Sequence, residues 1–127
     1  MLSPGEKRSR LEKALALGGD THTLADVVQL IRDGKAQYWE RDDGLIITEI
    51  HTYPRRRDVH YWLASGDLRA CIDLQSKIDP WAIEQGCMMA TITGRKGWLR
   101  AAAAAGWMAS PNLYQMHRPL TGERQDG

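Results

Sequence analysis

The chain has 127 residues, a formal net charge of +1 and a hydrophobic content of 43%. This length predicts one domain that can bury a core of its own. A net charge this close to zero excludes a protein that holds nucleic acid or an anionic membrane through its overall field. The sequence contains no run of about 18 apolar residues and no signal peptide pattern at its start, so we expect no membrane partner and a cytoplasmic location.

Neither the cysteines nor the histidines predict a metal site. Cys71 and Cys87 lie in apolar segments without the spacing of metal ligands, which is typical of buried thiols in a reducing compartment. His22 and His117 have no partner at ligand spacing in the sequence. We therefore expect no bound metal.

The first third of the chain predicts two helices. Ser3-Pro4-Gly5-Glu6 has the pattern of a capped helix start, and Gly18-Gly19 ends that helix. Its apolar stripe is narrow, so we expect residues 1–20 to dock on the domain or on another chain. Thr23 caps a second helix, which Gly34 ends. Residues 21–120 are predicted to form the main domain, followed by a polar tail at 121–127.

The middle of the chain predicts a three-stranded antiparallel meander. Residues 36–41 and 45–53 are rich in aromatic and β-branched side chains, and Asp42-Asp43-Gly44 between them is a hairpin signal. A third strand follows at residues 59–64 after the polar connection Pro54 to Asp58.

The next segment predicts a helix and a parallel strand. Residues 68–86 have helical spacing, and we expect Asp79-Pro80 to interrupt the helix. Residues 87–93 form an apolar run that fits a buried strand, parallel to the third strand and joined to it by a right-handed crossover. A further helix from Gly94 to Gly106 and last strands at 107–108 and 113–117 complete the prediction.

This order of elements resembles the GNAT N-acyltransferase fold, a mixed α/β (α+β) architecture. The strand at 87–93 and the helix after it end in the pair Gly106-Trp107, as they do in those enzymes. Two short blocks, Glu84 to Cys87 and Gly94 to Trp98, resemble small GNAT-like proteins encoded by bacteriophages and prophages, some of which are virion components. The resemblance implies a bacterial host and other phage structural proteins as partners.

The resemblance also implies where acetyl-CoA would bind. In active members a glycine-rich loop holds the pyrophosphate with backbone N–H groups at a helix N-terminus. The corresponding residues here are Ser65, Gly66, Asp67 and Leu68. One glycine remains, the leading Gln or Arg is missing, and Asp67 adds a carboxylate that repels phosphate and competes with it for the helix end.

The catalytic positions depart from the family as well. Many members carry a tyrosine about four residues before the Gly-aromatic pair as the general acid, and Ala102 stands there in this chain. Glu49 and His51 share a face of their strand with Leu45 and Ile47, and His60 lies on the next strand. Glu49 or His51 is the candidate general base. The alternative is that they are partly exposed strand residues paired with basic neighbours.

Two functions remain open at this point. One is a GNAT-like protein with a degenerate acyl-CoA site that binds other chains, as a virion component or as a homo-oligomer, without a cofactor. The other is an acetyl-CoA-dependent N-acetyltransferase with a non-standard cofactor loop. A candidate basic patch, expected to solvate a loop or to meet an anion or an acidic partner, consists of Arg55, Arg56 and Arg57 together with Arg95, Lys96 and Arg100; nucleic acid is the less favoured ligand.

Overall fold

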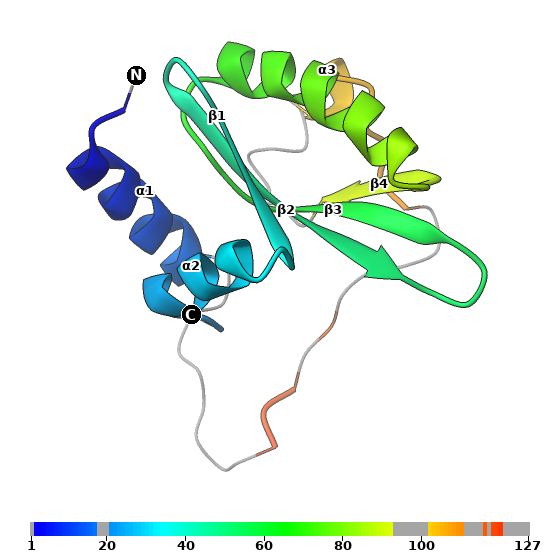
Figure 1. The fold of residues 1–127 in the computed structure, drawn as a ribbon, viewed down its shortest axis with the longest axis horizontal. Helices are drawn as coiled ribbons and strands as arrows, with labels where there is room; N and C mark the ends of the chain where they lie inside the picture. Colours follow the sequence, from blue (N-terminus) through cyan, green and yellow to red (C-terminus); the bar gives the residue numbers. More distant parts are fainter. Residues whose placement is uncertain (1, 18–20, 93–101, 111–115, 117, 121–127) are drawn as a thin grey trace.

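The computed structural model describes residues 2–17, 21–92, 102–110, 116 and 118–120. Its elements follow in the order α1 (Pro4–Leu17), α2 (Leu24–Arg32), β1 (Ala36–Arg41), β2 (Gly44–Thr52), β3 (Arg57–Ser65), α3 (Leu68–Glu84) and β4 (Met89–Ile92). Figure 1 shows their arrangement. Within the described residues, no helix has the length and apolar character needed to cross a membrane.

The four strands form one mixed sheet in the order β1-β2-β3-β4. The first three strands pair antiparallel, as the meander predicts, and β4 pairs parallel to β3. Asp42, with a φ of 50°, makes the β1–β2 turn at the predicted position. The parallel strand is therefore correctly predicted, but its burial is not: Met88 is 75% exposed and Met89 is 49% exposed.

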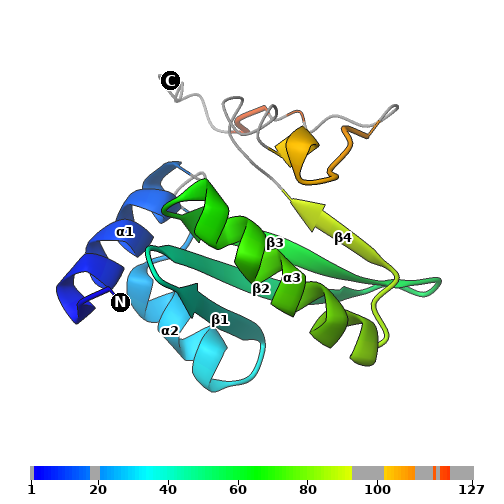
Figure 2. The ribbon, with the colours of Figure 1, turned by 90° about the horizontal axis from the view of Figure 1, so that it is seen from above.

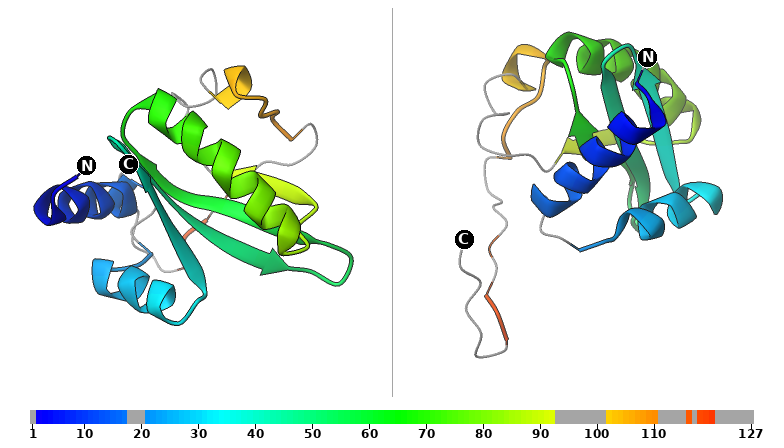
Figure 3. Two further views of the ribbon diagram at one scale, coloured as in Figure 1. Left: turned by 45° about the horizontal axis from the view of Figure 1, so that its top comes forward. Right: turned by 90° about the vertical axis from the view of Figure 1, so that its left-hand side faces the viewer.

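The helices cover opposite faces of the sheet. α1 and α2 pack on the face that carries Leu45, Ile47 and Leu63, and α3 packs on the face that carries Ile46 and Val59. Figure 2 shows α3 lying along the sheet, and Figure 3 shows α1 and α2 on the other side of it. The first helix thus docks on this domain.

The N-termini of the first two helices have the predicted caps. The Ser3 hydroxyl accepts a hydrogen bond from the Glu6 N–H at 3.2 Å. Thr23 and Asp26 form a complete capping box, and bonding to Thr23 lowers the pKa of the Asp26 carboxyl. These contacts span three residues, which is why the sequence pattern finds them.

The prediction that Asp79-Pro80 interrupts the helix is wrong. α3 is continuous through Pro80. Ile78 and Ala82, on either side of the proline, are both buried on the sheet, while Pro80 itself faces solvent. Packing on both sides of the proline keeps the helix continuous. The carbonyl of the preceding turn, which has no N–H donor because residue 80 is a proline, lies on the solvent side of the helix.

The end of the chain is described in part. Residues 102–104 are helical, and Gly106, with a φ of 93°, ends the turn as predicted. The backbone N–H of Trp107 bonds to the carbonyl of Ala102 at 3.0 Å, which closes the helix end. Residues 107–110 are not a strand, contrary to the prediction for 107–108. Most of the predicted helix at 94–106, the strand at 113–117 apart from Met116, and the tail at 121–127 lie outside the described residues.

Candidate functional site

A β-bulge shapes the centre of the sheet. Ile47 pairs with Leu63 and Thr48 pairs with Tyr61, so Trp62 is the extra residue. Trp62 and Leu63 therefore both pack on the α1 and α2 face. The His22 ring, in the connection between those helices, meets the Trp62 ring edge-on with a centroid distance of 4.7 Å. The bulge thus places the Trp62 ring against His22, just before α2.

Four polar side chains gather on the same face, beyond the part that α1 and α2 cover. Glu49 lies opposite His60, and His60 lies opposite Thr91, so three strands contribute to one row. His51 joins the row: its Nε2 is 3.6 Å from Glu49 Oε1, and its ring stacks on His60 at a centroid distance of 5.1 Å. We call Glu49, His51, His60 and Thr91 the polar row.

His60 has the most constrained environment in the polar row. Its Nδ1 is 2.8 Å from the Thr91 hydroxyl oxygen. Burial, and then the neighbouring His51, lower the pKa of His60, against an opposing effect of Glu49 and Asp58. The imidazole is therefore neutral near pH 7, the state in which it can accept a proton.

The structure brings together the two residues predicted as a general base, Glu49 and His51. Sequence reasoning placed His60 on the next strand but did not include it as a site residue, and Thr91 was missed. A register prediction could have found both, because the position of β4 against β3 decides which side chains meet. Within the described part of the chain, no group of three or more His, Cys, Asp or Glu is arranged to hold a metal ion.

The predicted cofactor loop joins β3 to α3. Ser65 ends β3, Gly66 has a φ of 110°, and Asp67 is the N-cap of α3, which begins at Leu68. The Asp67 carboxylate accepts the backbone N–H of Arg69 at 3.3 Å. The loop thus has the strand-to-helix geometry of a phosphate-binding turn, with a carboxylate at the helix end.

A second carboxylate residue lies against this loop. A side chain on Gly66 would overlap the backbone carbonyl of Asp43 in the β1–β2 turn. Burial, and then the charges of Asp67 and Asp43, raise the pKa of the Cys71 thiol to about 11. The N-terminal end of α3 therefore lies near two carboxylates, of which that of Asp43 is paired with Arg10, whose Nη2 is 2.6 Å from Asp43 Oδ1.

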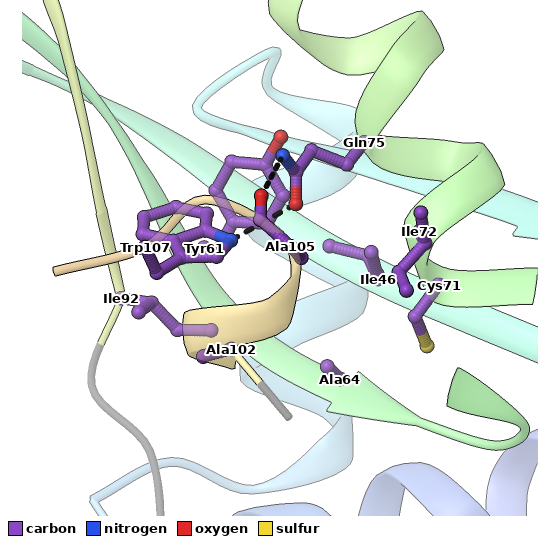
Figure 4. Close-up of a pocket in the computed structure, with 10 residues that line it drawn as sticks. All are labelled: Ile46, Tyr61, Ala64, Cys71, Ile72, Gln75, Ile92, Ala102, Ala105 and Trp107. Carbon is purple, nitrogen blue, oxygen red and sulfur yellow. Dashed lines mark hydrogen bonds between the residues drawn. The ribbon is translucent and has the colours of Figure 1, made fainter. Parts of the chain in front are cut away.

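A narrow apolar groove lies between α3, the β3–β4 pair and residues 102–107. Figure 4 shows its lining, which includes Tyr61, Ala64, Ile92, Ala102 and Ala105. The described pairing of β3 with β4 runs as far as Tyr61 and Ile92, and both of these residues line the groove. Its volume is about 40 Å³, little more than one water molecule needs.

Trp107 closes one end of this groove. Its indole N–H donates to Gln75 Oε1 at 2.9 Å, and the Gln75 amide donates to the carbonyl of Ala105 at 3.3 Å. The Trp107 ring also meets Tyr61 edge-on at a centroid distance of 5.2 Å (Figure 4). Trp107 is thus hydrogen-bonded to α3 through Gln75 and packed against β3 through Tyr61.

Comparison with known proteins gives structural likeness without sequence likeness. No protein-family model matches the chain, and no curated protein is significantly similar to it in sequence. The wild-type protein TTHA1254 from Thermus thermophilus is 19% identical, with 95% of this chain and 96% of that chain covered and a TM-score of 0.62. A probable acetyltransferase is 9% identical, with 88% of each chain covered and a TM-score of 0.64.

A third solved structure has an assigned activity. Glucosamine-6-phosphate N-acetyltransferase from Arabidopsis thaliana is 14% identical, with 94% of this chain and 95% of that chain covered and a TM-score of 0.57. At these identities the likeness concerns the fold. The expected mixed sheet, an antiparallel meander followed by a parallel strand, is thereby confirmed, and the chain has the fold of the GNAT acetyltransferases.

Proposed function

We propose that this chain is a GNAT-fold protein that binds other protein chains and has lost acyl-CoA catalysis. The observation that carries the proposal is the groove closed by Trp107. An arm the size of pantetheine needs a site on the scale of 300–1,000 Å³. The groove has about 40 Å³ because Ala102, Ala105 and Trp107 pack against α3 and β3.

The loop before α3 supports the same conclusion. A phosphate there would meet the Asp67 carboxylate, which already satisfies an N–H of the first turn. The backbone carbonyl of Asp43 also packs directly on Gly66, while the Asp43 carboxylate is paired with Arg10. The Asp67 carboxylate at the helix end therefore disfavours a pyrophosphate at residues 65–68.

The groove also lacks a general acid at the position expected from the family. Ala102 lines the groove with a methyl group at the position where many GNAT enzymes carry a proton-donating tyrosine. On the resemblance of residues 84–87 and 94–98 alone, we place the binding role in a bacteriophage particle or its assembly. Other phage structural proteins would then be the partners.

A thermal unfolding experiment tests the loss of the cofactor. The midpoint of the full chain is measured with and without millimolar acetyl-CoA, with the Arabidopsis enzyme as the positive control. We expect no change for this chain. A ligand present at 100 times its dissociation constant would add about 2.7 kcal/mol and raise the midpoint by several degrees. Such a shift would overturn the proposal.

The second candidate is an acetyl-CoA-dependent N-acetyltransferase. The polar row favours it, because a neutral His60 lies next to Tyr61, which lines the groove, and has Glu49 and His51 beside it. These groups could accept a proton from an amine. If the chain is such an enzyme, acetyl-CoA should raise its thermal unfolding midpoint. This shift should be lost in Ala64→Trp, which fills the groove without touching the polar row.

A further inference from the structure

A second surface lies far along α3 from the loop at 65–68. At the C-terminal end of α3, Ile83 is 70% exposed, and in the following connection and strand Met88 is 75% and Met89 is 49% exposed. Figure 1 shows this end of α3 next to the start of β4. The three side chains surround one cavity, and we call this region the α3–β4 surface.

The cavity inside the α3–β4 surface is larger than the groove beside Trp107. Its volume is about 180 Å³, and buried Val59 and Ala82 form part of its wall, together with Cys87 and Ala90. A cavity of about 150 Å³ is enough to hold a benzene ring. The space therefore fits one aromatic or branched aliphatic side chain from outside.

An arginine with unused bonding capacity stands beside this cavity. Arg57 donates from Nη1 to the carbonyl of Gln85, and its Nε is buried and has no hydrogen-bond partner in the described part of the chain. Arg56 is different, since its Nε lies 2.9 Å from the buried Asp58 carboxylate. Within the described part of the chain no carboxylate forms a salt bridge with Arg57, so its half-buried guanidinium can pair with a carboxylate that a ligand brings.

The remaining charges around the cavity do not supply that carboxylate. Asp79 lines the inner wall, and its Oδ1 accepts the Tyr61 hydroxyl at 2.6 Å. The exposed Arg55 adds positive charge to the connection that carries Arg57. The rim therefore carries both signs, because Glu84 is exposed at the end of α3, and the centre is apolar apart from Asp79.

We propose that the α3–β4 surface docks a segment of a partner protein in which one large apolar residue is flanked by a carboxylate. The apolar residue enters the 180 Å³ cavity, where methionines adapt to its shape, and the carboxylate meets Arg57. This inference rests on the proposed binding role and names its interface. A second copy fits less well, because a twofold contact brings the arginines of both copies to one interface.

Peptide selection tests the docking site. A displayed library of random twelve-residue peptides is selected on the immobilised full chain, and the binding of enriched peptides is measured by fluorescence polarisation. We expect peptides that share an Asp or Glu close to a single large apolar residue. Their affinity should fall about tenfold or more in Met88→Glu and in Arg57→Gln. Val28→Glu, a change at an exposed apolar residue of α2, should leave it unchanged.

Three results would overturn the inference. One is a library that yields no binder, and another is a set of binders whose affinity is the same for wild type and Met88→Glu. The third is a dimer in light scattering that Met88→Glu converts to a monomer, which makes a second copy the occupant. Thermal midpoints confirm that each variant is folded. Acetyl-CoA binding is measured in a separate experiment. A negative result in the peptide selection therefore does not decide whether the chain has lost catalysis.

Discussion

Gly66 and Asp43 are in backbone contact although they lie on different loops: a side chain at position 66 would overlap the Asp43 carbonyl. The β1–β2 turn therefore packs directly against the loop before α3. Gly44, next to Asp43, is also closely packed, since a side chain there would come within 2.8 Å of the Ala70 Cβ. The two glycines let a hairpin turn and a helix N-terminus share one tightly packed region.

Gly66→Ala is expected to destabilise the protein by about 2–4 kcal/mol. The substitution combines a steric overlap with a φ of 110°, which side chains rarely adopt. Urea unfolding measures the loss. The control is Gly34→Ala, where φ is 73° and nothing lies within 4 Å of the added carbon. Its cost should stay near 1 kcal/mol, and equal costs at the two positions would contradict the contact with Asp43.

Pro80→Ala is expected to stabilise the protein by about 1–2 kcal/mol. Alanine restores the missing N–H inside α3 and removes the clash of the ring with the preceding turn. Part of the gain is offset because the unfolded chain becomes more flexible. Lys77→Ala, at an exposed position one turn earlier, should change stability by less than about 0.5 kcal/mol. A Pro80→Ala variant less stable than wild type would mean that the ring makes contacts the helix needs.

Trp107 and Gln75 are expected to be energetically coupled by about 1 kcal/mol. Trp107→Phe removes the indole donor and Gln75→Met removes its acceptor, so the double variant should lose less than the sum of the single variants. Unfolding free energies of the four proteins give the coupling. Trp81→Phe serves as the comparison, because Trp81 packs edge-on against Trp39 and should combine additively with Gln75→Met. Additive losses of stability for Trp107→Phe and Gln75→Met would contradict a stabilising hydrogen bond between the two side chains.

The stability of the protein should fall as the pH drops from about 7 to about 5. The pKa of His60 is lower in the folded state than its usual value near 6.5. In this window the unfolded chain therefore binds more protons than the folded chain, and protonation favours unfolding. His60→Gln should flatten the pH dependence of the unfolding free energy measured in urea.

His51→Gln provides the matched variant for that experiment. Removing the His51 charge takes away one cause of the lowered pKa of His60, so the slope should become smaller without disappearing. Asp26 and Glu40 also have lowered pKa values, Asp26 through the Thr23 cap and Glu40 through its bond to Lys7. Their stabilising effects are lost only near pH 4 and below, which separates them from the histidine window. An unchanged slope in His60→Gln would contradict the assignment.

The sequence by itself determined the features that depend on neighbouring residues. The Thr23 cap, the Asp42–Gly44 turn and the alternation along β2 each involve residues a few positions apart, so local chemistry decides them. The same holds for the helix end at Gly106. Together they predict the order of elements, and that order leads to the fold.

Only the tertiary structure decided which distant residues meet. The continuity of α3 through Pro80 depends on the sheet beneath it, and the bulge at Trp62 depends on the register of β3 against β2. The meeting of His60 with Thr91 and the tie between Gln75 and Trp107 join residues about thirty positions apart. Such contacts are fixed by packing across the whole domain, where one shift in register would replace every partner.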